Sequence, residues 1–262
     1  MPLPPIIFED DTLLVFNKPS GLPVVSERSG KEQENLTAQV KAVFGAGLSN
    51  VHRLDAETSG LIVWAKTKPA LDFVSGQFQS KAVQKIHHAV VVVLPLEDSL
   101  PSDTIVRNES GLVPELFSID WWIGRDSAKP GRMKVFRRNG GEPAQSDFVV
   151  RENFGRFVFV ECRPQTGRKH QLRVHLAAAG LPILNDALYG DPERLLLLSD
   201  IKRGYKGRAD ERPLIKQLAL HASELVITHP TTREPLALHA PLPPEFEVAL
   251  KNMRKFCRGR RT

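Results

Sequence analysis

Ten consecutive residues, VHRLDAETSG (51–60), concentrate side chains that can do chemistry. Asp55 offers a carboxylate, and the two basic residues His52 and Arg53 stand just before it. The strongly apolar run LIVWA (61–65) follows directly, which is typical of a buried strand. The order of polar and apolar residues therefore predicts a loop that presents Asp55 at the start of a buried strand.

Several common catalytic motifs are missing from the chain. It has no GxxxxGK[ST] or GxGxxG loop for phosphates, no GxSxG elbow, and no HExxH or CxxC metal pair. His170 and His175 would point about 140° apart on a helix, so they cannot share one ion. Cys162 and Cys257 have no metal-ligand spacing, and we expect free thiols. We therefore expect no metal and no cofactor, with Asp55 as the reactive group.

Positive charge is concentrated in three segments. The chain carries a formal net charge of +6, and its last residues, KNMRKFCRGRRT, contain six Lys or Arg and no acid. Four more basic residues occur in RPQTGRKHQLRVH (163–175) and four in IKRGYKGR (201–208). One such cluster usually marks a solvated surface, but three together favour a nucleic acid as partner.

The hydrophobic pattern predicts an α+β fold with a mixed, mostly antiparallel central sheet, because strands and helices follow each other without steady alternation. A hairpin with a turn at Asp10-Asp11 should open the chain, its second strand ending before Pro19. Loops that could carry substrate contacts are expected at 95–115 and 190–213. The other expected elements are helices at 33–44, 69–81 and 168–179, the last amphipathic, and strands at 61–67, 85–94, 117–123, 132–137, 145–151 and 156–162.

Length and hydropathy limit the class of protein further. No segment approaches the roughly 18 apolar residues of a membrane span, and the N-terminus has no secretory-signal pattern. We expect a cytoplasmic protein with one catalytic domain over residues 1–250 and a basic C-terminal tail over 251–262. A monomer is the default expectation.

Two motifs resemble one known family. HRLDAETSGL (52–61) is similar to the HRLDxxTSGL signature of the RluA family of RNA pseudouridine synthases, and GRKHQLRVHL (167–176) to its GRTHQLRVHL segment. Further similar segments follow in the same order over about residues 6–244; they are EDDTLLVFNKPSGLPV, SIDWWIGRD, PAQSDFVV, GLPILNDALYG and LALHASELVITHP. These motifs are specific for the family and not for a substrate.

The resemblance implies an enzyme that isomerises a uridine within structured RNA, either rRNA or tRNA, after the nucleotide is flipped out. Asp55 matches the catalytic aspartate, and Arg173 matches the arginine that pairs with it. An ionised carboxylate in a pocket that excludes water needs such a cationic partner, and a guanidinium can bind it with two hydrogen bonds. Arg168 and Lys169 are candidates for phosphate contacts.

Other residues of the two motifs have supporting roles in the same interpretation. His52, Arg53 and His170 are expected to approach the RNA, although the first two could simply order the loop. Thr58 and Ser59 are expected to hydrogen-bond the loop backbone. Gly60 is expected to permit a tight backbone turn into the following strand.

The chain departs from the family pattern at three positions. KIHHAV (85–90) aligns with a KxYxAxV element, and His87 stands where the family has a tyrosine that packs on the target uracil. An imidazole can also stack on a base and exchange protons, so we hypothesise that His87 replaces the tyrosine, although it could be an ordinary strand residue. Asn185 and Arg233 stand where glycines are common in turns.

Two alternatives stay open at this level. A non-catalytic RNA-binding protein could use the same fold, and a hydrolase could use Asp55 to cut a glycosidic or phosphoester bond. The intact HRLD motif argues against the first, and the absence of a second carboxylate motif against the second. Because the similar region begins near the first residue, the form expected lacks the N-terminal RNA-binding domain of many relatives.

Overall fold

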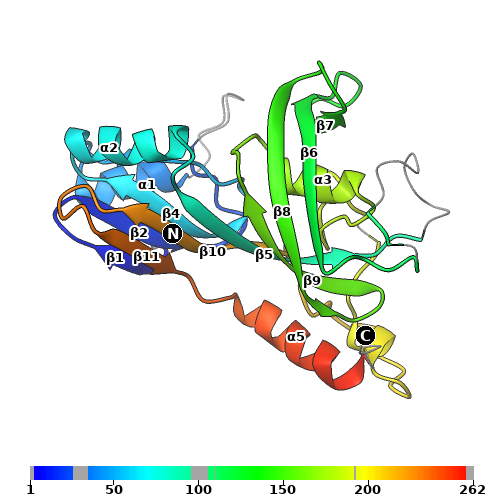
Figure 1. Ribbon diagram of the computed structural model, residues 1–262. Coiled ribbons are helices and arrows are strands. Elements are labelled where there is room, and N and C mark those ends of the chain that lie inside the picture. Colours follow the sequence, from blue (N-terminus) through cyan, green and yellow to red (C-terminus); the bar gives the residue numbers. More distant parts are fainter. Residues whose placement is uncertain (1–2, 26–34, 96–105, 109, 192, 258–262) are drawn as a thin grey trace. The chain divides into compact units, whose positions relative to one another are not determined.

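The computed structural model describes residues 3–25, 35–95, 106–108, 110–191 and 193–257 (Figure 1). The chain divides into two compact units, unit 1 with residues 1–86 and 221–241 and unit 2 with residues 87–220 and 242–262. Their strands pair mostly antiparallel, whereas β4 and β10 are parallel, and helices flank them, which confirms the expected α+β class. Within the described part of the chain, no helix is both long and apolar enough to cross a membrane.

Unit 1 is built on the strand order β1-β2-β4-β10, with β3 added to β4 and β11 to β10. The expected hairpin is present, and its second strand ends at Lys18. Strands β4 and β10 run parallel, whereas the other pairs of this unit are antiparallel. The strands are β1 (Ile6–Glu9), β2 (Leu13–Lys18), β3 (Ser49–Asn50), β4 (Ser59–Ala65), β10 (Leu220–Thr228) and β11 (Pro235–His239).

The apolar strands of unit 1 are buried on both faces. Alternate residues of β4 enter two separate cores, one with Leu61 and Val63 and the other with Ile62 and Trp64. The first core includes Val74 of α2 (Lys68–Gln79), and the second includes Val40 of α1 (Leu36–Phe44). Because successive side chains of a strand point to opposite faces, this arrangement explains the continuous apolar run LIVWA.

Both helices of unit 1 begin at side-chain caps. The Asn35 side chain accepts a hydrogen bond from the backbone N–H of Ala38 at 2.9 Å, and Thr67 accepts one from Ala70 at 3.3 Å. A proline in the first turn of α2 adds to this signal, since its missing N–H has no helical partner there. The two helices confirm the predictions made for 33–44 and 69–81, with ends shifted by a few residues.

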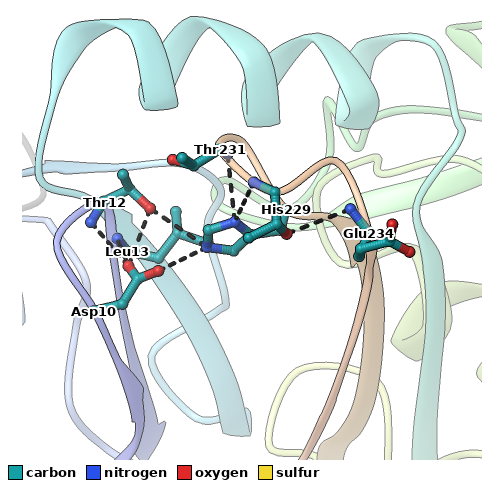
Figure 2. A network of polar contacts seen from close by, with 7 residues as sticks. Asp10, Thr12, Leu13, His229, Thr231 and Glu234 are labelled. Carbon is teal, nitrogen blue, oxygen red and sulfur yellow. Dashed lines mark hydrogen bonds and ion pairs between the residues drawn. The ribbon is translucent and has the colours of Figure 1, made fainter.

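A polar network joins two turns of unit 1 (Figure 2). His229 follows β10, and its Nδ1 accepts backbone N–H groups of Thr231 and Thr232 at 3.3 and 3.2 Å. Nε2 therefore carries the proton and donates to Asp10 Oδ2 at 2.7 Å. Burial alone would raise the pKa of Asp10, but hydrogen bonds from Thr12, Leu13 and His229 hold it below its ordinary value.

Unit 2 contains a second run of strands, in the order β5-β9-β8-β6-β7, all antiparallel. Figure 1 shows β6 and β8 as its longest arrows. A bulge interrupts the β8–β9 register between Val150 and Glu152. The strands are β5 (Gln84–Val92), which begins in unit 1, β6 (Leu116–Arg125), β7 (Met133–Phe136), β8 (Glu142–Asn153) and β9 (Phe157–Pro164).

The helices of unit 2 correct two expectations. Helix α3 (Gln171–Ala178) is buried on nearly every side, so it is not the amphipathic helix expected at 168–179. Helix α5 (Pro244–Phe256) occupies the first half of the segment expected to be a basic tail. Leu250 and Met253 belong to the core of this unit, and their burial explains why the helix continues. Residues 258–262 lie outside the described range.

The expected loops are largely confirmed where the structure describes them. Part of the segment 95–115 (96–105 and 109) lies outside the described residues. The segment 190–213 is irregular except for the short helix α4 (Leu198–Ile201). Both cysteines are free thiols, as expected.

Candidate active site

The Asp55 loop is held by hydrogen bonds from the segment that follows β2. Gly21 donates its N–H to the carbonyl of Ala56 at 2.8 Å, and Ser20 donates its hydroxyl to the carbonyl of Glu57. Inside the loop, the N–H of Thr58 donates to the carbonyl of Asp55 at 3.1 Å. Asp55 is half-buried and belongs to an ordered loop.

Lys18 lies fully buried beneath this loop. Its Nζ donates to three backbone carbonyls, those of Pro19 at 3.0 Å, Leu22 at 2.9 Å and Ala56 at 2.8 Å. Three acceptors match the three N–H groups of an ammonium ion. Burial lowers the pKa of Lys18 to about 7, and the attraction of Glu57 and Asp55 opposes that shift. Nothing in its local sequence, at a strand end before Pro19, marks Lys18 as part of the site.

Gly60 permits the close pairing of β4 with β10. It has a φ of 113°, and a Cβ at this position would lie 2.2 Å from the carbonyl oxygen of Ala222. Next to it, the Ser59 hydroxyl lies 2.9 Å from Nδ1 of the buried His221. The glycine predicted to allow a tight turn also permits the approach of a distant strand.

His52 has a structural position within unit 1. Its ring stacks on Phe78 of α2 with centroids 4.7 Å apart, and its Nε2 accepts the backbone N–H of Val63 at 3.3 Å. Burial and the nearby charge of Lys85 lower the pKa of His52 to about 4, so the ring is neutral at physiological pH. Arg53 is exposed. An approach of either residue to RNA stays a prediction.

In unit 2, Arg173 forms a buried ion pair with Asp186. Nε and Nη2 donate to the two carboxylate oxygens of Asp186, both at 2.8 Å, and the residues are 2% and 1% exposed. Asp186 Oδ1 also accepts the backbone N–H groups of Leu188 and Tyr189. Asp186 was missed at the sequence level, where its neighbour Asn185 was considered only as a turn residue. The predicted partner of Arg173, Asp55, belongs to unit 1, and that pairing stays a prediction.

Tyr189 connects several residues around Arg173. Its ring lies 5.4 Å from the Arg173 guanidinium carbon and 5.0 Å from that of Arg132. Its hydroxyl accepts the backbone N–H of Met133 at 2.7 Å and lies 2.8 Å from His170 Nδ1. Burial raises the pKa of Tyr189. These contacts connect the β6–β7 hairpin to the segment that carries Arg173.

Gln171 uses both ends of its side-chain amide to fix the start of α3. Its Oε1 accepts hydrogen bonds from the Thr166 hydroxyl and the Arg168 backbone N–H, at 2.7 and 3.0 Å. Its Nε2 donates to the Gln145 carbonyl and the Ser146 hydroxyl of β8, both at 2.9 Å. Gln171 thereby orients the segment in which Arg173 lies.

The three basic residues before α3 lie in different environments. Arg168 forms an ion pair with Glu142 and donates to the carbonyl of Pro143 at 3.2 Å. Lys169 is exposed, whereas His170 is 9% exposed and adopts a left-handed conformation with φ of 56°. Their contacts with RNA stay predictions, and Lys169 is the one most open to solvent.

His87 lies on β5, opposite Cys162 of β9, and is partly buried. The next residue, His88, stacks on Phe159 with centroids 5.1 Å apart. On β5, therefore, the ring that stacks on an aromatic neighbour is that of His88, whereas His87 is the residue that aligns with the family tyrosine. The role of His87 stays a hypothesis.

The two replaced turn glycines are explained by local contacts. Asn185 and Arg233 both adopt left-handed conformations, with φ of 61° and 64°. Asn185 donates its amide to the carbonyls of Ile215 and Gln217. The Arg233 guanidinium lies 3.9 Å from the ring centroid of Phe73. These contacts offset the cost of a non-glycine residue at positive φ.

Comparison with known proteins agrees with this geometry. A model of the RNA pseudouridylate synthase family matches residues 12–178, which include the Asp55 loop and all of α3. The chain belongs to this family, and the resemblance noted from its motifs is confirmed.

Two curated relatives and one solved structure show how far the similarity extends. Ribosomal large subunit pseudouridine synthase D of Neisseria meningitidis is 35% identical over 95% of this chain, and synthase C of Vibrio cholerae is 33% identical over 95%. The chain spans 61% and 69% of their respective lengths. Human RNA Pseudouridylate Synthase Domain Containing 4 matches with a TM-score of 0.65 and 28% identity, covering 95% of this chain and 92% of that one.

Proposed function

We propose that the chain isomerises a uridine in RNA to pseudouridine with Asp55 as the catalytic carboxylate. The observation that carries this proposal is the half-buried Asp55, ordered by hydrogen bonds from the segment after β2, in a chain of this family. The bond between C1′ of the ribose and N1 of uracil breaks, the base turns, and C5 bonds to C1′. N1 gains a proton and C5 loses one, so the reaction needs no oxidant.

An ionised aspartate can serve this reaction without a metal. It can attack an electron-poor C1′, as carboxylates do in retaining glycosidases, or attack the uracil ring, or take up a proton. Lys18 supports each role, because its ammonium group fixes the loop backbone and adds positive charge near the carboxylate. Arg173, held by Asp186, is the proposed partner of the reacting groups.

The substrate we propose is structured RNA, with ribosomal RNA favoured over transfer RNA. Two relatives carry names that describe synthases of the large ribosomal subunit. The target uridine must leave its stack, which costs a few kcal/mol, so the flanking strand must be held by its phosphates. The exposed Lys169 and Arg53 and the β6–β7 hairpin, with basic residues such as Lys134 and Arg138, supply suitable charge.

The decisive experiment compares the parent with Asp55→Ala and Asp55→Asn on total ribosomal and transfer RNA. Pseudouridines are mapped by carbodiimide reactivity. We expect new sites with the parent and none with either variant, while both variants keep the parent's affinity for RNA within a few fold. RNA binding without any new pseudouridine would instead favour a non-catalytic RNA-binding protein.

His87 is proposed to line the pocket in place of the family tyrosine. The replacement predicts activity that changes between about pH 5 and 7, where an unperturbed histidine titrates. His87→Tyr and His87→Phe should each alter the pH profile of the single-turnover rate. If both variants kept the parental rate and profile, His87 would be an ordinary strand residue.

A further inference from the structure

Two basic segments that lie about fifty residues apart in sequence come together in unit 2. The first is the turn after α4, residues 202–208, and the second is the end of α5, residues 251–256. Helices α4 and α5 are in contact, and Figure 1 shows the yellow α4 region beside the red end of α5. Lys202 joins the segments directly, because its Nζ lies 5.4 Å from the ring centroid of Phe256.

Aromatic rings lie among these cations. Nζ of Lys202 is also 5.4 Å from the ring of Tyr205, and Nζ of Lys255 is 5.2 Å from the ring of Phe256. Both rings are half-buried, so each still exposes part of its surface. Gly204, with φ of 81°, stands just before Tyr205 and lets the chain turn there. We call this the α4–α5 basic surface; it consists of Lys202, Arg203, Tyr205, Lys206, Arg208, Lys251, Lys255 and Phe256.

Two neighbouring carboxylates have other partners. Glu211 accepts the backbone N–H of Ser199 at 2.9 Å, and Glu152 forms a two-bond ion pair with Arg254. Among the described residues, no ion pair is found for the six cations of the α4–α5 basic surface. Five of them, Arg203, Lys206, Arg208, Lys251 and Lys255, are exposed.

Many other arginines of unit 2 are neutralised by an acid. Glu161 binds Arg151 and Arg163, and Asp186 binds Arg173. The α4–α5 basic surface differs from these sites, because six cations lie together there and no ion pair is found for them among the described residues. Cations repel one another when they are gathered without acids, so their gathering is best explained by an anionic partner.

We propose that the α4–α5 basic surface binds a single-stranded segment of the substrate RNA, apart from the target uridine. The exposed cations contact phosphates, and Tyr205 and Phe256 offer ring faces on which unpaired bases stack. This inference rests on the proposed function for the identity of the RNA. An acidic protein would use the charges alone and would leave the rings unused.

The charge contribution is tested with the double variant Arg203→Glu and Lys206→Glu, whose side chains are exposed and make no packing contact described above. The matched control is Lys41→Glu with Lys216→Glu, which changes the net charge equally at two exposed lysines elsewhere. Binding to a fluorescent single-stranded 20-mer is measured from about 50 to 200 mM salt. We expect the first variant to bind at least about tenfold more weakly, with a salt slope smaller by about 1.4. The control should stay within about twofold.

The stacking contribution is tested with Tyr205→Ala and Tyr205→Phe. Loss of one stacked base should weaken binding about tenfold in the alanine variant, and the phenylalanine variant should recover it. Polyphosphate has no bases, so it should bind to Tyr205→Ala and Tyr205→Phe with equal affinity, as measured by competition. Equal binding by parent and Tyr205→Ala would reject stacking and leave an anion-binding surface of another kind.

The outcomes separate this inference from the proposed function. If Arg203→Glu/Lys206→Glu and its control weakened binding equally, net charge alone would explain the result and the surface would be rejected. At RNA concentrations below the dissociation constant, the surface variants should slow pseudouridine formation by about the factor by which they weaken binding, whereas Asp55→Ala abolishes it without weakening binding. Loss of activity without loss of binding in the surface variants would overturn the inference while leaving the proposed function standing.

Discussion

The two regions that carry the candidate catalytic charges are held in opposite ways. The Asp55 loop is fixed by backbone carbonyls, which accept from the single buried ammonium group of Lys18 and from the N–H of Gly21. The Arg173 segment is fixed by side chains, chiefly Asp186 and Gln171. Asp55 itself is half-buried, whereas Arg173 is almost fully buried.

This difference agrees with the roles proposed for Asp55 and Arg173. The role proposed for Asp55 requires a carboxylate in a fixed position, and the hydrogen bonds from Lys18 and Gly21 order the loop that carries it. A guanidinium that must keep one orientation can be paired on one edge with an acid, because two parallel hydrogen bonds fix its plane. Damage should therefore be more severe in the Arg173 segment, where removal of one partner leaves a buried charge.

The largest effect is expected for Asp186→Asn. It leaves the Arg173 guanidinium buried without its counter-charge, which should lower the free energy of unfolding by about 3 to 5 kcal/mol. Urea denaturation measures this loss. The double variant Arg173→Met with Asp186→Leu removes both charges and should regain much of the stability while remaining inactive. A double variant as unstable as Asp186→Asn would show that charge burial is not the cause.

An intermediate effect is expected for Lys18→Met. The loss of three hydrogen bonds to carbonyls should cost about 1 to 3 kcal/mol and lower activity at least about tenfold, because the Asp55 loop loses its support. Circular dichroism and single-turnover rates measure the two losses. A variant with normal stability and normal activity would contradict the role given to Lys18.

Lys18 also predicts a pH dependence of stability. Its folded pKa of about 7 lies below the ordinary value of 10.5, so between these values the unfolded chain binds more protons. The contribution of Lys18 to the free energy of unfolding therefore rises as the pH increases from about 7 to about 10. Lys18→Met should remove that rise, which chemical denaturation at pH 7 and pH 9.5 can detect.

The smallest effect is expected at the turn network of unit 1. Asp10→Asn loses the charged acceptor of His229 and should cost about 1 kcal/mol near pH 6. Because the folded pKa of Asp10 is lowered, its contribution is present above the unfolded value of 3.8 and is lost as pH falls through the folded value. The difference between parent and variant should shrink as pH falls below 3.8, and a constant difference would exclude this linkage.

Local sequence signals were sufficient for much of the fold. The turn at Asp10-Asp11 and the spacing of apolar residues located the first hairpin and both helices of unit 1. The HRLD loop was placed at the start of β4 because a polar segment followed by the apolar run LIVWA allows few other interpretations.

The remaining features depend on contacts between distant residues. The polar residues of α3 can be buried because Gln171 reaches β8, and sequence spacing cannot show such a partner. Lys18 and Asp186 are buried by segments that fold back over them. The end of α5 was taken for a tail because Lys and Arg there outweigh the apolar spacing of Leu250 and Met253.

The contact between β4 and β10 also has a consequence for synthesis of the chain. Ser59 and His221 are 162 positions apart, and Gly60 can fulfil its role only when Ala222 reaches it. While the ribosome is still translating the region before residue 222, the strand next to Asp55 has no parallel neighbour in unit 1. Unit 1 can therefore complete its sheet only after residue 222 has been made, so the strand that follows the Asp55 loop gains its parallel neighbour long after its own synthesis.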